Sequence, residues 1–359
     1  MDLVLNILKI SLSIISILAV IASKLKVSNW WVRVFDFPRI QLLLMATLAI
    51  VLFLMPYSEF NNFNLGLLTL VVFSWFYQAR KIFPYTVVAG KEVYHDKTSN
   101  PDNEIAILVS NVLTPNRHVE KLISLVKKHQ PNLVLTLESD KWWEEQMSVL
   151  EEDYKCQVKI PLDNLYGMHL YSNLELKDTK VHYLVEDDIP SIHTSVILPS
   201  GKPIQIHCIH PEPPSPTESD TSLPRDAELL IVGKNVKDAE LPTLVFGDLN
   251  DVAWSRTTRL FQKISGLLDP RKGRGFFNTY NAKHLPFRWP LDHIFHSEDF
   301  VLREIKRLPS ISSDHFPMFI RLKLKADNGQ EDKEEALDKD EKNWTEETIG
   351  KANPNILTI

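Results

Sequence analysis

The sequence predicts an α/β fold of two packed β-sheets flanked by helices, with transmembrane helices in front of it. Three observations predict this fold. Residues 1–82 contain long apolar runs of the kind that cross a bilayer. From residue 104 onward, many short apolar runs of strand length follow one another, with a few amphipathic helical patterns between them. Many short strands with few helices are typical of an α/β sandwich.

Three segments in the N-terminal membrane domain, residues 1–82, are long and apolar enough, or nearly so, to span a hydrocarbon core of about 30 Å. We expect helices at residues 3–22, 39–56 and 63–79. Tryptophan and tyrosine residues flank these segments, as they do at membrane interfaces. A signal peptide fits the first segment poorly, because no small-residue cleavage site follows it. Two helices remain an alternative, since the third segment is short and the first contains Lys9.

Basic residues give the expected orientation. They gather between the first and second segments and after the third: Lys24, Lys26, Arg33, Arg39, Arg80 and Lys81. The other loop carries only Glu59 as a charged residue. Since basic loops stay in the cytoplasm, we expect a multi-pass protein of the cell inner or plasma membrane with a cytoplasmic C-terminal domain. A C-terminal domain on the outer side of the membrane is the alternative, because large domains can cross regardless of local charge.

Composition sets the expected boundaries of the remaining chain. Residues 83–103 are a polar linker, 104–325 a globular domain and 326–359 a disordered acidic tail. A formal net charge of -6 gives no general attraction to nucleic acid. Cys156 and Cys208 show no disulfide or zinc-type spacing, and we expect both to be buried thiols.

Hydrophobic periodicity within the globular domain predicts the individual elements. Strands are predicted at residues 104–110, 132–137, 157–160, 168–172, 180–185, 191–198, 203–209, 243–246, 291–296, 300–308 and 316–323. Helices are predicted at residues 118–129, 224–237 and 254–265. The adjacent Trp142 and Trp143 indicate a packed amphipathic helix, although an exposed stacking or lipid-contact surface is an alternative.

The stretch Gly247-Asp248-Leu249-Asn250 follows the apolar strand at 243–246. Residues two apart at the end of a strand point to the same side, so Asp248 and Asn250 face one point. An acid there can orient or deprotonate a water, and an amide can donate to an anionic oxygen. An ordinary Asx-rich turn is the alternative when the motif is taken alone.

Polar residues at other strand termini strengthen the functional interpretation. They are Asn111, Glu138, His210, Asp292, Asp314 and His315. Each alone is compatible with a solvated surface position. Together with Asp248 and Asn250, these residues mark six polar strand termini on one sheet system, which favours a common site.

The order of these motifs resembles the endonuclease/exonuclease/phosphatase superfamily, over about residues 106–324. The strings Gly247–Asn250 and Ser313–Pro317 carry most of the resemblance. The string His210–Pro214, followed by Arg225-Asp226 and preceded by three membrane helices, is similar to a bacterial membrane-anchored branch. The resemblance implies a four-layered α/β sandwich of the deoxyribonuclease I type.

The resemblance also implies a role for each site residue. Glu138 would bind the metal, with Asn111 and Asp314 close to the same ion. Magnesium, or manganese in its place, suits such oxygen ligands. The remaining implied roles are catalytic. Asp248 would activate water, and Asn250 would hold a phosphate oxygen. His315 would bind the phosphoryl group with Asp292 as its carboxylate partner, and His210 would stabilise the leaving oxygen.

The loop Asp269–Gly275 contains three positive charges between glycines. Arg271 and Arg274 are therefore candidates for a second anion site, which would bind a headgroup or a neighbouring phosphate. A solvated turn is the alternative.

We therefore expect a membrane-anchored, Mg²⁺-dependent phosphoester hydrolase, a phosphodiesterase acting on a lipid-borne or membrane-adjacent substrate. An endonuclease or exonuclease on DNA or RNA is the first alternative. A catalytically idle membrane scaffold is the second, and the intact set of polar residues argues against it. Membrane lipid is the expected partner besides the substrate, and no protein partner is predicted.

Overall fold

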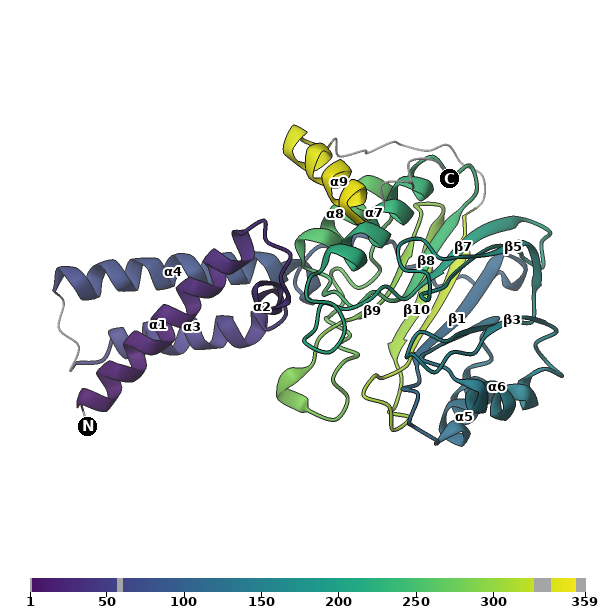
Figure 1. The fold of residues 1–359 in the computed structure, drawn as a ribbon, viewed down its shortest axis with the longest axis horizontal. Coiled ribbons are helices and arrows are strands. Elements are labelled where there is room, and N and C mark those ends of the chain that lie inside the picture. The colour runs from purple at the N-terminus through teal and green to yellow at the C-terminus, as the bar shows by residue number, and fades with distance from the viewer. Residues whose placement is uncertain (1, 57–60, 326–336, 353–359) are drawn as a thin grey trace.

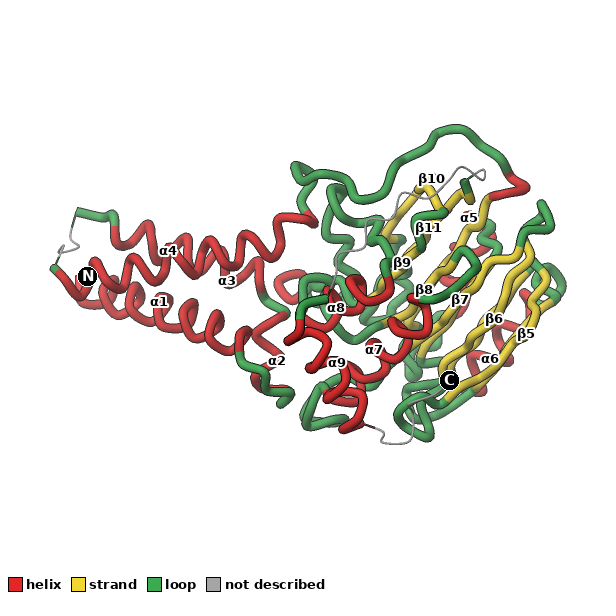
Figure 2. Tube along the Cα trace, turned by 90° about the horizontal axis from the view of Figure 1, so that it is seen from above, coloured by secondary structure: helices red, strands yellow, loops and turns green. Residues whose placement is uncertain are grey.

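A computed structural model describes residues 2–56, 61–325 and 337–352. Figure 1 shows a sandwich of two sheets with a helical bundle projecting from one end. The bundle consists of α1 (Asp2–Lys24), α3 (Arg39–Phe53) and α4 (Asn62–Ile82), which pack against one another and run side by side in Figures 1 and 2. A connector joins α1 to α3 and contains α2 (Trp30–Arg33) and η1 (Val34–Asp36).

The three predicted membrane segments all form helices, but they differ in length and composition. Among the described residues, α1 alone is a single unbroken helix that is long and apolar enough to cross a membrane. The connector and α3 pass the same test together, as a pair bent by 72°. Helix α4 has 21 residues and fails it, because asparagine, glutamine and basic residues occupy both of its ends. The prediction of three spans is thus supported for the first segment and only conditionally for the second.

The bundle buries polar side chains together with a small apolar cluster of Ala46, Ala49 and Val71, and its exterior is apolar. Its buried side chains include Lys9, Ser13, Ser16, Ser74 and Gln78. Ser74 Oγ donates to the Ser16 carbonyl at 2.8 Å. Large apolar side chains are exposed along the outer surfaces of all three helices: Leu3, Ile7, Leu18, Leu44, Leu48, Phe63, Leu70 and Phe76.

The first sheet has six strands in the order β10-β11-β1-β2-β4-β3. Their bounds are β1 (Glu104–Asn111), β2 (Leu133–Leu137), β3 (Cys156–Ile160), β4 (Met168–Ser172), β10 (Phe300–Arg307) and β11 (Met318–Leu324). The second sheet has five strands in the order β5-β6-β7-β8-β9. Their bounds are β5 (Glu175–His182), β6 (Ser191–Ile197), β7 (Pro203–Ile209), β8 (Thr243–Asp248) and β9 (Asp292–His296).

Helices cover the outer faces of both sheets. Apolar residues from both sheets form the central core, including Ile107, Leu135, Ile206, Phe246 and Ile320. Helices α5 (Val119–His129) and α6 (Lys141–Met147) pack on the first sheet, and α7 (Leu223–Lys237) and α8 (Arg256–Ser265) pack on the second. The order helix, sheet, sheet, helix confirms the four-layered α/β sandwich.

Three segments differ from the sequence-based expectation. Residues 339–352 of the expected disordered tail form helix α9 (Lys339–Ala352), which packs on α7 through the buried Ile349. Residues 326–336 and 353–359 of that tail lie outside the described part of the chain. Strand β5 begins at Glu175 rather than at residue 180, because its exposed polar residues obscure the strand pattern. Cys156 is only half-buried, whereas Cys208 is buried as expected.

The expected linker, residues 83–103, is packed onto the sandwich rather than extended away from it. It contains η2 (Phe83–Tyr85) and η3 (Pro101–Asn103). Tyr85 is buried and donates its hydroxyl to the Ala253 carbonyl at 2.8 Å. Val93 belongs to the central core. The bundle is therefore joined to the sandwich by packed structure.

Candidate active site

Strand direction explains why distant residues meet at one edge of the sandwich. Strand β1 pairs in parallel with β2, and β7 pairs in parallel with β8, so their carboxyl ends point the same way. Asn111 ends β1, and Glu138 follows β2 directly. Strand β9 runs antiparallel to β8 and begins at Asp292, directly opposite Asp248. The polar termini noted in the sequence therefore lie together.

The end of β8 has a backbone that only particular residues allow. Gly247 has a φ of 151°, and a Cβ there would lie 1.9 Å from the Ile209 carbonyl oxygen, so β7 and β8 approach closely. Asn250 has a φ of 49° in the left-handed region, which asparagine tolerates. Its backbone N–H donates to Asp248 Oδ1 at 3.0 Å, and its side-chain amide donates to the Pro211 carbonyl at 3.0 Å. The turn fixes the Asp248 carboxylate and holds Asn250 beside the segment after β7.

Asn111 links two carboxylates. Its Nδ2 donates to Glu138 Oε1 at 2.7 Å and to Asp248 Oδ2 at 3.1 Å. Its Oδ1 accepts the backbone N–H of Leu113 at 3.1 Å. One amide nitrogen therefore holds Glu138 and Asp248 within one site. Because the amide oxygen of Asn111 faces the backbone, this arrangement makes Asn111 a hydrogen-bond donor to the carboxylates, and metal ligation by it stays a prediction.

Three buried ionisable side chains, His315, Asp292 and His210, lie near the Asp248 carboxylate. His315 Nδ1 lies 2.8 Å from Asp292 Oδ2, and His315 Nε2 lies 3.4 Å from Asp248 Oδ2. His210 Nε2 lies 3.9 Å from the same Asp248 oxygen. The two imidazoles therefore approach the same Asp248 oxygen from segments that are far apart in the chain. The backbone N–H of Asp292 donates to the Thr279 hydroxyl at 3.2 Å, which helps to fix the start of β9.

The two histidines differ in charge. Burial lowers the pKa of His210 to about 4. Burial also acts to lower the pKa of His315, but the carboxylates of Asp292 and Asp248 outweigh it and raise that pKa to about 10. His315 is therefore the imidazolium at neutral pH, and His210 is neutral.

The carboxylates of Asp248 and Glu138 differ in the direction in which their pKa values are shifted. Burial of Asp248 acts to raise its pKa, but the nearby His315 charge and the hydrogen bonds from Asn250 and Asn111 outweigh this and lower the pKa. Burial raises the pKa of Glu138 to about 7, because no comparable cation lies beside it. Asp248 is thus ionised at neutral pH, whereas Glu138 lacks a partner for its charge.

Glu138 fits a divalent cation. Among the described residues, its Oε2 atom is buried and has no hydrogen-bond partner. Its backbone has a φ of 57°, held in part by a hydrogen bond of 2.8 Å from Thr114 Oγ1 to the Glu138 carbonyl. A buried carboxylate oxygen with no partner is what an oxygen-seeking ion such as Mg²⁺ would bind. Ligand atoms of Asp248, Asp292 and His315 also lie within 4.8 Å of one another, but in this group both carboxylates already pair with His315.

Arg271 and Arg274 do not form the expected anion site. Arg271 is buried, and its guanidinium donates to both oxygens of Asp269 at 2.9 and 2.7 Å. Its remaining donors lie against the Asp292 carbonyl and His293 Nδ1. Arg274 donates to backbone carbonyls of Pro270 and Val93. Arg271 therefore supports β9, and Arg274 ties its loop to the segment that contains Val93.

Two tyrosines near the site were missed by the sequence reasoning. The Tyr166 ring lies 5.3 Å from His210, and the Tyr280 ring lies 5.0 Å from His315. Asp314 is half-buried, and its carbonyl accepts the Ala282 backbone N–H at 2.6 Å. No motif marked the tyrosines, because both come from segments outside the strands.

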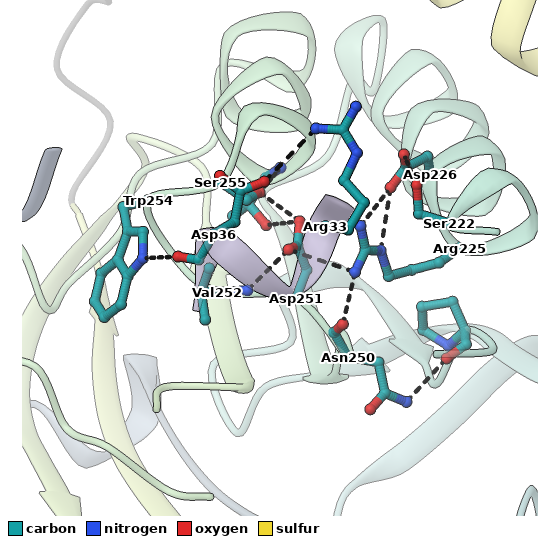
Figure 3. Close-up of polar contacts among 12 residues, drawn as sticks. Arg33, Asp36, Ser222, Arg225, Asp226, Asn250, Asp251, Val252, Trp254 and Ser255 are labelled. Carbon is teal, nitrogen blue, oxygen red and sulfur yellow. Dashed lines mark hydrogen bonds and ion pairs between the residues drawn. The ribbon is translucent and has the colours of Figure 1, made fainter. Parts of the chain in front are cut away.

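A buried hydrogen-bond network holds the segment Asn250–Val252, which follows Asp248 in the chain (Figure 3). Arg225 Nη1 donates to the Asn250 carbonyl at 2.9 Å, and the same guanidinium pairs with Asp226 at 2.8 Å and Asp251 at 3.5 Å. Asp251 also accepts the Val252 backbone N–H at 2.9 Å. The pair Arg225-Asp226 contributed to the sequence resemblance, and this contact gives it a role in positioning Asn250.

The connector between α1 and α3 packs onto this same loop. Trp254 Nε1 donates to the Asp36 carbonyl at 2.8 Å, as Figure 3 shows. The Ser222 backbone N–H, at the start of α7, donates to the Ser28 carbonyl at 2.7 Å. The connector therefore contacts the two segments that hold Arg225 and Asn250.

Comparisons with known proteins agree with this geometry. The family model described as Endonuclease/Exonuclease/phosphatase family matches residues 108–315. No curated protein sequence matches the chain.

Solved structures of low sequence identity share the fold. The human Nocturnin catalytic domain with bound sulfate has a TM-score of 0.51 at 15% identity, covering 63% of this chain and 97% of that one. D. rerio TDP2 complexed with single strand DNA product has a TM-score of 0.52 at 15% identity, covering 62% and 99%. An endonuclease/exonuclease/phosphatase from Bacteroides vulgatus has a TM-score of 0.50 at 15% identity, covering 62% and 99%. The chain belongs to the endonuclease/exonuclease/phosphatase family, whose members are metal-dependent hydrolases of phosphoester bonds.

Proposed function

We propose that this protein is a membrane-anchored, Mg²⁺-dependent phosphodiesterase whose substrate is a phosphoester carried by, or adjacent to, a membrane lipid. The observation that carries the proposal is the large apolar surface that the bundle exposes along all three helices, while polar side chains such as Lys9, Ser74 and Gln78 are buried inside it. A water-soluble bundle would bury the apolar side chains that this one exposes, and exposed apolar surface on this scale marks a membrane or protein contact. The lengths of α1 and α4, 23 and 21 residues, suit a bilayer.

The bundle's charge distribution supports a multi-pass anchor with the sandwich in the cytoplasm. Lys24 ends α1, and Arg80 and Lys81 occupy the last turn of α4, both at the end of the bundle that adjoins the sandwich. Basic residues favour the cytoplasmic side. A reporter fused after Lys325 should be active only in the cytoplasm, and a reporter active only outside would refute this orientation.

The site residues divide the chemical work. Glu138 would hold Mg²⁺, with Asp314 and Asn111 beside it, and the bound ion would neutralise charge on the phosphoryl oxygens. Asp248, ionised at neutral pH, accepts the proton of the attacking water, and the Asn111 and Asn250 donors fix its orientation.

The imidazoles act on the phosphoryl oxygens and on the leaving oxygen. His315, held charged by Asp292, donates to a phosphoryl oxygen and stabilises negative charge that develops there. His210 is neutral and lies beside Asp248, where it can donate to the leaving oxygen. Removing His315 would take away the imidazolium charge that lies between Asp248 and the phosphoryl group.

Hydrolysis of bis-p-nitrophenyl phosphate by the full chain in nanodiscs tests the reaction class. We expect Mg²⁺-dependent activity that EDTA abolishes and that Glu138→Gln or Asp248→Asn lowers by about 10²-fold or more. Glu152→Gln, which changes an exposed glutamate, is the matched control. Activity that persists unchanged in both site variants would refute the assigned roles.

A substrate panel tests the substrate class. Phospholipid and sphingolipid nanodiscs, plasmid DNA and RNA would be offered to the same preparation. Faster hydrolysis of a lipid phosphoester supports the proposal. Faster cleavage of nucleic acid than of any lipid would overturn it in favour of a nuclease.

A further inference from the structure

A short loop beside the active site exposes large apolar side chains next to positive charge. The loop spans residues 283–288 and contains η5 (Leu285–Phe287). Leu285 is 71% exposed and Phe287 is 57% exposed. Lys283 and His284 precede them and are exposed, and Arg288 follows them. In the family reaction described above, none of these side chains has a role.

The base of this loop borders the catalytic residues. The Ala282 backbone N–H donates to the Asp314 carbonyl at 2.6 Å, and Tyr280 forms a β-bridge with His315. Arg288 donates to the Ala282 carbonyl at 3.1 Å and lies over the Phe316 ring at 5.0 Å. These contacts fix the loop as a rim of the site.

The same loop is attached to the helical bundle. Gln41 Nε2, in the first turns of α3, donates to the Pro286 carbonyl at 2.5 Å. Phe37, in the connector, packs edge-on against Trp289 with ring centroids 5.6 Å apart. In Figure 1 the loop, light green, projects from the sandwich toward the side that carries the bundle. If the bundle crosses a bilayer, the loop lies where the bundle emerges from it.

We propose that the loop 283–288 inserts into the headgroup layer of the bilayer that anchors the bundle, and that it presents the active site to phosphoesters of lipid headgroups. This inference rests on the proposed function. Apolar side chains flanked by cations suit this layer, because the former enter the acyl boundary while the latter meet lipid phosphates. The loop is continuous with the apolar exterior of α3, and its charge is complementary to anionic lipid. A lipid surface is therefore the partner that both features fit.

Site-specific fluorescence tests the insertion without reference to activity. An NBD label would be attached to Phe287→Cys, Leu48→Cys or Val149→Cys in a chain carrying Cys156→Ser, reconstituted in nanodiscs of phosphatidylcholine and phosphatidylglycerol. Leu48 is exposed on α3, and Val149 is exposed on η4 (Ser148–Leu150), which packs with α6. We expect blue-shifted emission and quenching by doxyl lipids at positions 48 and 287, and water-like emission at position 149.

Each fluorescence outcome is decisive. Emission at position 287 that matches position 149, with position 48 in lipid, overturns the loop insertion and leaves the membrane anchor intact. Water-like emission at position 48 as well overturns the anchor, and the loop insertion with it.

Activity gives a second, independent readout. The double variant Leu285→Ser/Phe287→Ser should lower the ratio of lipid hydrolysis to bis-p-nitrophenyl phosphate hydrolysis by about ten-fold or more. Losing one apolar side chain from the lipid weakens partitioning of the loop into the bilayer by about this factor. Val149→Ser should leave the ratio unchanged. An unchanged ratio in the double variant would contradict the loop's role, whereas absence of hydrolysis of both substrates by the unmodified protein would contradict the proposed function itself.

Discussion

Replacing Arg225 with methionine should both destabilise the sandwich and slow hydrolysis. Arg225 is 2% exposed and pairs with Asp226 and Asp251, which are also buried. Methionine fills similar volume but leaves two buried carboxylates without their cation. Breaking a buried ion pair in this way costs about 3–5 kcal/mol. At roughly 2–4 °C per kcal/mol, the melting temperature should fall by about 6–20 °C.

The effect on catalysis comes through Asn250. Arg225 Nη1 donates to the Asn250 carbonyl at 2.9 Å, so its loss frees the turn that orients Asp248. A displacement of about 1 Å near reacting groups can lower a rate by 10²-fold, and we expect kcat to fall by about that factor. Because Arg225 does not face the phosphoryl group, KM should change much less than kcat.

Thermal unfolding of the detergent-solubilised full chain and hydrolysis of bis-p-nitrophenyl phosphate measure the two effects. Arg225→Lys keeps the charge but loses the planar fork, so it should give an intermediate result. Arg259→Met changes an exposed arginine on α8 and is the matched control. A melting temperature that falls by less than about 2 °C in Arg225→Met, with kcat unchanged, would refute the reasoning.

The remaining predictions concern a buried glutamate, the partner of His315 and helix α9. Burial raises the pKa of Glu228 to about 8 from an ordinary value of 4.5, so the stability linked to its proton is complete below pH 4.5 and is lost as the pH rises through 8. Glu228→Gln should therefore raise the melting temperature at about pH 9 and change it little at about pH 4; the same shift at both pH values would contradict this. Asp292→Asn removes the carboxylate that holds His315 charged and should lower kcat by about 10²–10³-fold; wild-type turnover of the soluble diester would exclude that role. Trp344→Ala removes the ring over which the Arg256 guanidinium lies at 4.2 Å and should cost about 1–2 kcal/mol in unfolding free energy; an unchanged melt would show that α9 contributes nothing at this contact.

The sandwich was predictable because its signals are local. Strands β1, β2, β7 and β8 are apolar runs of buried residues, each ended by a polar residue or motif. Parallel pairing places the polar termini of β1 and β2 at one edge of the first sheet and those of β7 and β8 at one edge of the second. The packing of the two sheets then brings Asn111 within 3.1 Å of Asp248.

The features that were missed depend on partners far away in the chain or on weak local patterns. Arg271 looks like an exposed anion ligand in sequence, but Asp269 and the rear of β9 enclose it. The contact between Asp36 and Trp254 joins residues separated by 218 positions, and no local pattern marks it. Helix α9 is charge-rich, so its apolar contacts at Ile349 were hidden by composition.

The charge states of the two histidines were equally inaccessible from sequence. His210 and His315 both follow or precede buried strands, and both approach Asp248. Only His315 has a second carboxylate, Asp292, within hydrogen-bond distance. This difference in three-dimensional partners raises one pKa and leaves the other lowered by burial.

Mn²⁺ binding, followed by electron paramagnetic resonance on the full chain in nanodiscs, tests the central claim most directly. That claim is that Glu138 forms part of a divalent-cation site held together with Asp248 by Asn111. The account predicts Mn²⁺ binding that Mg²⁺ displaces, that Glu152→Gln leaves intact, and that Glu138→Gln weakens by at least about ten-fold. Equal Mn²⁺ affinity in Glu138→Gln and the unmodified protein would contradict it.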